Sequence, residues 1–335
     1  MIVVISDLHL TAQPLDEYRW AVMYRLRDEV NARDDVDEVW CLGDITDAKD
    51  KHPSALVNRL VGWVLSFDVP VRILKGNHDY INGEMPFFKF LDSFEDIYYY
   101  TEPTLEDTPA GRVLWLPHTR TAVEDWAKQS LKGVDIVLTH QSYDGAMAAN
   151  GFKLESKLTP RYFSKRGFNG VVLSGDIHTP QAIGDVTYVG TQYPVVFGDT
   201  YSPRYLEVHG SGSDVEVRPV PVDSIRKMVV QMTTLEDLPK LRAGDQIKVV
   251  YNLERSEIGR WDEICNDVRT CVEFAGAVLR GMECKFTDVN HKQGTAHRYS
   301  KDAKSSSDIV RSFIMSVGLG QEDERYALKF TNDKG

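Results

Sequence analysis

The sequence predicts an α/β fold: a four-layer-type β-sandwich flanked by helices, followed by a small α+β capping domain. Two observations support this prediction. Short apolar runs rich in valine, isoleucine and leucine recur along the first two hundred residues, as in strands buried within a layered sheet. Helical stretches separate several of these runs, and strands that alternate with helices are typical of an α/β core.

The alternation begins at the first residues of the chain. A helix is expected from about Asp16 to Val30, and a second follows Pro53, where apolar residues recur on one face. Strands are expected at 2–5, 39–42, 71–74, 136–138, 171–173, 186–189, 205–208 and 215–217. Ligands gather beyond the carboxyl ends of strands in such sheets, so the residues that follow the first five strands are expected to lie together.

A smaller unit is expected after Pro219 and Pro221, which suggest a boundary. Its elements have the order strand, strand, helix, strand, and are expected at 227–232, 246–251, 256–274 and from 277 onward. A polar linker then leads to a short amphipathic helix at 309–317. The expected organisation is therefore a main domain, a capping domain and a linker with a C-terminal helix, at 1–222, 223–290 and 291–335.

Five groups of polar residues follow the first five strands, one group at each strand end. In chain order they are Asp7-Leu8-His9, Gly43-Asp44, Gly76-Asn77-His78-Asp79, Thr139-His140 and Gly175-Asp176-Ile177-His178. A single such group often arises by chance, and a lone aspartate there would be interpreted as a helix cap. Five groups in this order are specific. The glycines before Asp44 and Asn77 suit sharp turns where the backbone approaches a metal.

This residue set suits the hydrolysis of a phosphate ester. That reaction needs a nucleophilic oxygen and neutralisation of charge on the phosphoryl group, and two metals about 3.5–4 Å apart supply both. Aspartate, asparagine and histidine are the mixed ligands that such a pair requires. The expected cofactors are two divalent ions, with Mn the first choice and Mg, Fe or Zn as alternatives.

With these motifs the chain resembles the calcineurin-like metallophosphoesterase superfamily. Within it, the chain is most similar to SbcD-type DNA repair exonucleases, the nuclease partners of SMC-like ATPases, and its compact size suits a phage or bacterial version. The similarity covers about 1–205 and includes Gly190-Thr191 and Phe197-Gly198-Asp199, which resemble the G-S…F-G-E segment of these nucleases. The unit at 225–290 resembles their capping domain, and the helix at 309–317 resembles their ATPase-docking tail.

The resemblance implies a role for each motif residue. Seven would hold the metals: Asp7, His9 and His178 the first ion, Asn77, His140 and Asp176 the second, with Asp44 as the bridge. His78 would stabilise or protonate the phosphoryl and leaving oxygens, and Asp79 would orient His78. The resemblance also implies DNA as the substrate, a homodimer formed through 56–64 or 87–94, and an SbcC-type ATPase partner.

One motif departs from the family pattern. The family usually ends its last motif as G-H-x-H, whereas this chain has Gly175-Asp176-Ile177-His178. Asp176 replaces a neutral imidazole with a shorter, anionic ligand. We expect the site to retain its second metal and to shift toward harder ions; the alternative is a weakened second site.

Candidate substrate contacts lie outside the motifs. Lys153, Lys157 and Arg161 belong to a basic stretch, with Lys165 and Arg166, that either follows a phosphate backbone or is a solvated face. Tyr143, Phe152, Tyr162 and Phe163 lie among them and could stack on bases, although core packing is expected for at least two. His52 lies near the bridging aspartate and could touch substrate, and His118 is interpreted as structural.

Bulk properties narrow the function classes. A net charge of −11 disfavours a protein that grips nucleic acid with its whole surface, though a local basic patch remains compatible. The four cysteines form no zinc-finger pattern, and without an apolar run of membrane-spanning length or a leader signal we expect a cytoplasmic protein (host cytoplasm if phage-encoded). Three functions compete: a DNA exo- or endonuclease, a phosphodiesterase or phosphatase acting on a small nucleotide or phosphoprotein, and a non-catalytic assembly subunit.

Overall fold

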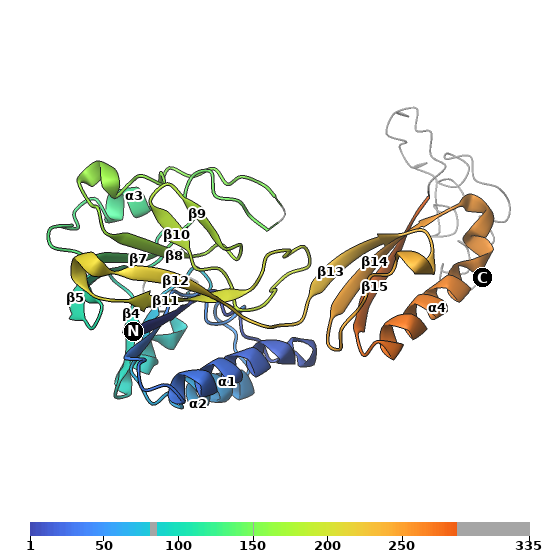
Figure 1. Ribbon diagram of the computed structural model, residues 1–335, viewed down its shortest axis with the longest axis horizontal. Coiled ribbons are helices and arrows are strands. Elements are labelled where there is room, and N and C mark those ends of the chain that lie inside the picture. Colours follow the sequence, from blue (N-terminus) through green and yellow to red (C-terminus); the bar gives the residue numbers. More distant parts are fainter. Residues whose placement is uncertain (81–85, 150, 287–335) are drawn as a thin grey trace, which may run out of the picture. The chain divides into compact units, whose positions relative to one another are not determined.

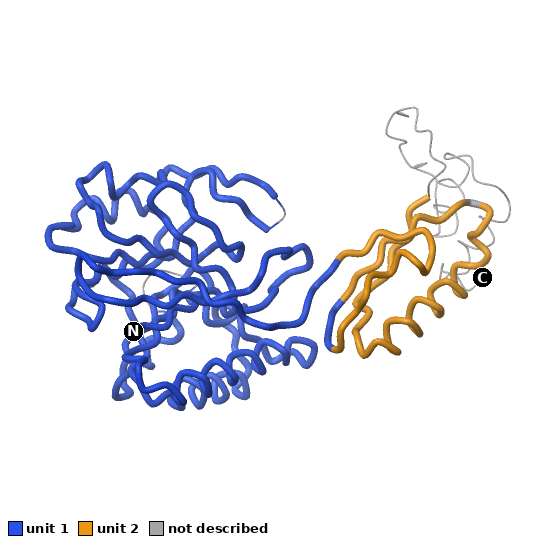
Figure 2. Tube along the Cα trace, viewed as in Figure 1, with its two compact units in different colours: residues 1–228, 244–246 blue, residues 229–243, 247–335 orange. Residues whose placement is uncertain are grey.

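The computed structural model describes residues 1–80, 86–149 and 151–286 (Figure 1). The chain divides into two compact units, the first comprising 1–228 with 244–246 and the second comprising 229–243 with the chain from 247 onward (Figure 2). The helix expected at 309–317 lies outside the described residues. Among the described residues, no helix is both long and apolar enough to cross a membrane.

The first sheet of unit 1 has six strands in the order β12-β11-β1-β2-β3-β4. Four neighbours are parallel, namely β1 (Ile2–Ile5), β2 (Glu38–Cys41), β3 (Val71–Leu74) and β4 (Ile97–Tyr100). Two antiparallel strands complete one edge, β11 (Arg204–His209) and β12 (Glu216–Pro221). Pro219 and Pro221 therefore lie within an edge strand, where a missing N–H is tolerated, and they do not mark a boundary.

The second sheet has the order β5-β6-β7-β8-β10-β9. Its four central strands are parallel: β6 (Gly111–Leu116), β7 (Ile136–His140), β8 (Val171–Gly175) and β10 (Val186–Tyr188). Its edges are the antiparallel strands β5 (Thr104–Thr108) and β9 (Gln181–Ile183). The sequence pattern did not indicate β4, β5 or β6. For β5, whose sequence is Thr-Leu-Glu-Asp-Thr, pairing with β6 rather than composition determines the strand.

The two sheets pack face to face with helices outside, so the predicted flanked β-sandwich is confirmed. Strand β1 shows the layering, because Ile2 and Val4 join the core between the sheets whereas Val3 and Ile5 join the core beneath the helices. Helices α1 (Glu17–Asn31) and α2 (Ser54–Val64) cover that outer face (Figure 1). The outer face of the second sheet packs on the short helix α3 (Ala122–Asp125) and on the chain after β7.

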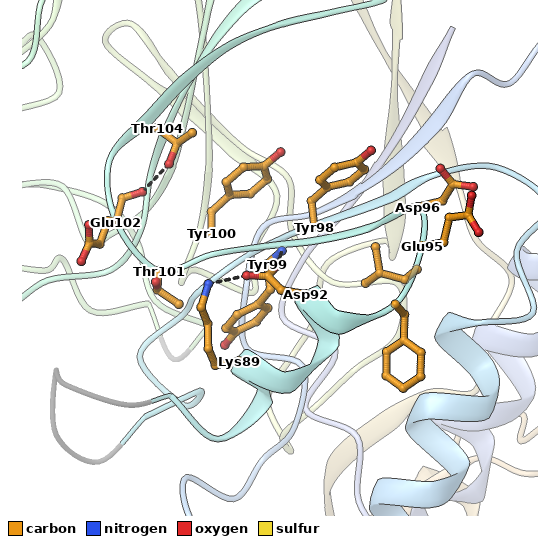
Figure 3. Close-up of a pocket in the computed structure, with 12 residues that line it drawn as sticks. Lys89, Asp92, Glu95, Asp96, Tyr98, Tyr99, Tyr100, Thr101, Glu102 and Thr104 are labelled. Carbon is orange, nitrogen blue, oxygen red and sulfur yellow. Dashed lines mark hydrogen bonds and ion pairs between the residues drawn. The ribbon is translucent and has the colours of Figure 1, made fainter.

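Aromatic side chains join the two sheets near β4. Along this strand Tyr98 and Tyr100 project to one side and Tyr99 to the other (Figure 3). Tyr100 stacks on Trp115 of the second sheet at 4.3 Å between ring centroids, and Trp115 meets Trp40 edge to face. Trp115 of β6 therefore joins the second sheet to β4, through Tyr100, and to β2, through Trp40.

Unit 2 contains one three-stranded sheet with a helix. The strands β13 (Lys227–Met232), β14 (Gln246–Leu253) and β15 (Val278–Phe286) are adjacent in chain order. Helix α4 (Trp261–Phe274) lies between β14 and β15 in sequence and buries Ile264, Val268 and Val272. The described elements thus have the order strand, strand, helix, strand.

Candidate metal centre

The five polar groups meet at one edge of unit 1. Each lies at or just beyond the carboxyl end of a parallel strand, β1, β2 or β3 in the first sheet and β7 or β8 in the second; His140 is the last residue of β7. Hydrogen bonds join the groups directly, since the backbone N–H of Asp176 donates to Asp7 at 3.0 Å and that of His78 donates to Asp44 at 2.7 Å. The packing of the sheets therefore brings together residues that are up to 171 positions apart in the chain, from Asp7 to His178.

The backbone at the site has an unusual conformation. Asp7, His9, Asp44 and Asp176 all have positive φ angles, of 55°, 42°, 55° and 83°. Such angles are uncommon for residues other than glycine and cost energy unless the surroundings hold them. Here the strand-end loops hold one another, because Asp7 N–H donates to the carbonyl of Gly43 and His9 N–H donates to that of Asp44. Four expected metal ligands are thus among the strained positions of the fold.

Glycines allow these loops to pack closely. A Cβ atom on Gly43 would lie 2.6 Å from Nδ1 of His140, and a Cβ on Gly76 would lie 2.2 Å from a carboxylate oxygen of Asp44. Gly175 is equally confined, 2.3 Å from the Ser6 hydroxyl. Close backbone approach thus explains the glycines before Asp44 and Asn77.

The first cluster of possible ligands contains Asp7, His9 and His178. One ligand atom from each lies within 4.8 Å of the others, and Nε2 of His9 is 3.1 Å from Nε2 of His178. Nδ1 of His9 faces the carboxylate of Asp47 at 3.5 Å, which leaves Nε2 as the coordinating atom. Two imidazole nitrogens that face each other beside a buried carboxylate form a suitable cation site.

The second cluster contains Asp44, Asn77, His140 and Asp176. Nε2 of His140 lies 3.4 Å from Asp44 and 3.8 Å from Asp176. The side-chain amide of Asn77 faces both carboxylate oxygens of Asp44, at 2.8 and 3.0 Å, and Nε2 of His140 at 3.1 Å; its NH2 group donates to them here, and the amide turned over would offer its oxygen to a metal. A cation between Asp44 and Asp176 would reduce the repulsion of their carboxylates. The residues present therefore fit a metal here.

Hydrogen bonds outside the clusters orient the possible ligands. Nδ1 of His140 must carry a proton, because its partner is the carbonyl oxygen of Leu42, which only accepts; Nε2 is then free for a metal. The hydroxyl of Ser6 donates to Asp7 at 2.6 Å, and that of Ser142 donates to Asp176. These two hydrogen bonds fix the direction of the Asp7 and Asp176 carboxylates.

Asp79 does not orient His78, contrary to expectation. Its carboxylate accepts three backbone N–H groups, those of Asp44 at 2.9 Å, Ile45 at 3.0 Å and Gly76 at 2.7 Å. Nδ1 of His78 instead contacts the carbonyl oxygen of Asp47 at 2.7 Å. Asp79 is fully buried and shapes the loops that present Asp44, whereas the carbonyl of Asp47 positions His78.

Sequence reasoning gave no site role to three neighbours of the centre. Asp47 contacts both His9 and His78, and its signal was the Asp-x-x-Asp spacing from Asp44. Ser142, two residues after His140, had no signal of its own. Asp199 lies 4.0 Å from Nδ1 of His178 and was noticed only as part of the family segment.

Charge is concentrated in this buried site. Burial opposes ionisation of Asp44, but the imidazoles of His140 and His9 outweigh it and hold the pKa of Asp44 below its ordinary value. Burial raises the pKa of Asp7 to about 6. Burial, with the nearby His9, lowers the pKa of His178 to about 3, so its imidazole is neutral, as a metal ligand must be.

The other candidate residues lie in different settings. His52 is engaged within its own loop, by Thr46 at 2.8 Å and the carbonyl of Ala48 at 3.1 Å, and its ring packs on Phe87. The basic residues after β7 that were expected near substrate are all exposed, namely Lys153, Lys157 and Arg161. Of the aromatic residues between them, Tyr143 and Phe163 are buried in the core, as expected, and Phe152 is 70% exposed.

Two packed sheets present buried carboxylates, imidazoles and an amide at their strand ends. This combination is typical of metal-dependent hydrolases. The calcineurin-like phosphoesterase family model matches residues 1–180, and the chain belongs to that family. No curated protein matches the chain closely enough in sequence to count as a relative. Membership establishes metal-dependent phosphoester hydrolysis as the chemistry, and the family usually uses two divalent metals.

Proposed function

We propose that this protein is a DNA nuclease of SbcD type, and that the two ligand clusters hold its metal ions. The observation that supports it most is the convergence of the complete motif set at one edge of the sandwich. Asp7, His9 and His178 would hold one ion, and Asn77, His140 and Asp176 the other, with Asp44 between them. When bound, the two ions supply charge neutralisation for the phosphoryl group and activation of water.

His78 is proposed to act on the substrate rather than on a metal. Its Nδ1 must donate to the Asp47 carbonyl oxygen, because a carbonyl only accepts, so Nε2 is the atom free to meet the substrate. Its ring lies edge to face on His9, with centroids 4.8 Å apart. From this position a protonated Nε2 would donate to a phosphoryl or leaving oxygen.

The loop after β7 supports a polynucleotide substrate. The backbone N–H of Met147 donates to the side chain of Gln181 at 2.9 Å, and Gln181 follows His178 by three residues. Met147 also forms an isolated antiparallel β-bridge with Lys153, and the side chain of Phe152, which precedes Lys153, is exposed. An exposed aromatic residue next to Lys153 suits stacking on a base and contact with a phosphate.

Assembly and the choice of metal belong to the same proposal. Of the two expected dimer segments, α2 already buries Leu56, Leu60 and Val64 within its own unit. Phe87 and Phe90 are 37% and 39% exposed, which favours 87–94 as the surface for a second copy. We propose Mn as the native ion, because Asp176 would be an oxygen ligand. We also propose a cytoplasmic setting (host cytoplasm if phage-encoded) and an SbcC-type ATPase as the partner.

The test is manganese-dependent degradation of linear double- and single-stranded DNA by the full chain. A generic phosphodiester, bis-p-nitrophenyl phosphate, is assayed in parallel, with His78→Ala and Asp44→Ala as controls. DNA loss that both substitutions abolish would support the nuclease and its metal centre together.

A small-nucleotide phosphodiesterase is the second candidate, favoured by the net charge of −11. Turnover of the small diester without DNA cleavage would select it. Turnover of neither substrate with Mn, Mg or Zn would refute both activities for the isolated chain and favour an assembly subunit.

A further inference from the structure

A pocket of about 440 Å³ lies beside the ligand clusters. Its walls come from the chain that follows β3, β4 and β6, and they include Lys75, Tyr80, Pro103, His118 and Trp126. The volume falls in the range of about 300–1,000 Å³ that is usual for small-molecule sites. It therefore has room for one nucleotide-sized group, and the residues that line it include none of the expected metal ligands.

Lys75 is an unusual residue for a pocket wall. It is only 6% exposed, yet among the described residues its ammonium group has no carboxylate within ion-pair distance. It makes a cation–π contact with Tyr80, in which Nζ of Lys75 lies 4.4 Å from the centroid of the ring. Its backbone is held on both sides, because its N–H donates to Tyr100 and its carbonyl accepts from His118. A buried ammonium that ion-pairs with no described carboxylate, and has Asp79 and Glu102 only at longer range, favours an anionic ligand.

Two side chains separate this lysine from the metal ligands. The hydroxyl of Tyr80 pairs with Nδ1 of His118 at 2.9 Å, and the ring of His118 lies 6.2 Å from that of His140, edge to face. The pocket is therefore adjacent to the second ligand cluster, with one layer of aromatic rings between them. A group bound on Lys75 would be a close neighbour of a phosphoryl group bound on the metals.

Acidic residues at the pocket do not cancel this preference. Glu102 and Glu124 are exposed, and the carboxylate of Asp125 accepts hydrogen bonds from Thr119 and Thr121. Water and salt screen exposed carboxylates, whereas the buried ammonium of Lys75 is screened much less. The described lining holds more carboxylates than ammonium groups, so the preference for an anion rests on the burial of Lys75.

We propose that this pocket binds the nucleotide unit next to the scissile bond, with its non-scissile phosphate on Lys75. The inference rests on the proposed action on nucleic acid and makes it more specific. The substrate class is then a phosphodiester that carries a second phosphate one nucleotide away, so that a strand or a phosphorylated dinucleotide is preferred over an isolated diester.

The first experiment uses the manganese-loaded full chain. Cleavage of the thymidine dinucleotide dTpdT is compared with that of its 5′- and 3′-phosphorylated forms. We expect kcat/KM to be at least tenfold higher for one phosphorylated form, and Lys75→Gln to lose that preference while Lys75→Arg keeps most of it. Lys132→Gln removes the same charge from an exposed position outside the pocket and should keep the preference in full. An equal preference in wild type and Lys75→Gln would overturn the proposal.

A second experiment separates this inference from the nuclease proposal. Thymidine 5′-monophosphate and thymidine are titrated by calorimetry into the full chain with excess chelator, where the acidic metal ligands repel phosphate. We expect at least tenfold tighter binding of the monophosphate than of thymidine, and a loss of at least tenfold in Lys75→Gln. That result, together with no DNA cleavage in the degradation assay, would support phosphate binding in the pocket and refute the proposed nuclease activity. Absence of monophosphate binding to the wild type would refute the pocket whatever the DNA result, even if Lys75→Gln fails to fold.

Discussion

Replacing Gly76 by alanine tests how closely the strand-end loops must pack. An added Cβ would lie 2.2 Å from a carboxylate oxygen of Asp44 and 2.4 Å from its backbone nitrogen. Both distances are far below van der Waals contact, and the neighbour is backbone, so the loop of Asp44 must move. Overpacking of this kind costs about 1–3 kcal/mol of folding stability. Because Asp44 belongs to the second cluster and lies 3.5 Å from Nε2 of His9 in the first, the same movement should weaken metal binding.

Gly62→Ala is the matched control. Gly62 lies within α2, and no atom comes within 4 Å of the position its Cβ would occupy. Removing a glycine from a helix interior stabilises by roughly 0.5–1 kcal/mol. The same chemical change is therefore expected to have opposite signs at the two positions.

Thermal unfolding with and without manganese is the assay. For a unit of this size, 1 kcal/mol corresponds to about 2–4 °C in melting temperature, so Gly76→Ala should melt roughly 2–12 °C lower and Gly62→Ala slightly higher. Gly76→Ala should also show a smaller upward shift on addition of manganese, as its affinity is reduced. A Gly76→Ala protein with wild-type melting and wild-type manganese affinity would refute the close-packing argument.

Four further outcomes are expected. Ser142→Ala should weaken manganese binding by roughly 10–100-fold, as measured by calorimetry, because Asp176 loses the hydroxyl that orients it; unchanged affinity would show that the hydroxyl is dispensable. Asp176→His should move the metal preference of hydrolysis from manganese toward zinc, since imidazole replaces an oxygen ligand; an unaltered order of metals would contradict this. Burial and the nearby His140 lower the pKa of His118 to about 3, so the folded state binds fewer protons than the unfolded state below pH 6.5 and stability falls as the pH decreases. In chelator, denaturant titrations should therefore show the wild type losing about 2 kcal/mol more than His118→Gln between pH 7.5 and 5; parallel curves would exclude this titration. Chelation at pH 8 should lower the melting temperature, because burial raises the pKa of Asp7 to about 6 and its ionised carboxylate is then left without a cation; a melting curve indifferent to chelator would contradict the metal fit.

Several features of the fold and site could be predicted from the sequence because local patterns encode them. Buried parallel strands appear as continuous runs of valine, isoleucine and leucine, and polar residues directly after such runs stand at the ligand-binding edge of a sheet. The strands before Asp7 and Asn77 were predicted on this basis. The close backbone approach at the glycines before Asp44 and Asn77 was also predicted. By contrast, β5 has almost no apolar character and depends on pairing with β6.

Roles within the site could not be predicted from neighbours in the chain. Asp79 follows His78 directly, yet its carboxylate turns to the backbone of Gly76, Asp44 and Ile45 because those N–H groups are buried and need acceptors. The partner of His78 is a main-chain carbonyl of Asp47, and a main-chain atom has no signature in sequence. His52 is likewise occupied by its own loop.

The sequence by itself determined the chemistry available to this protein: the ligand types, their order along the chain and their place at strand ends. Only the tertiary structure decided which atoms converge, that Ser142 supports Asp176, and that Lys75 is buried in a pocket wall without an ion pair to any described carboxylate. The physical reason is range. Strand formation and turns depend on residues a few positions apart, whereas the direction of a buried side chain depends on hydrogen-bond partners supplied by strands far away in the chain.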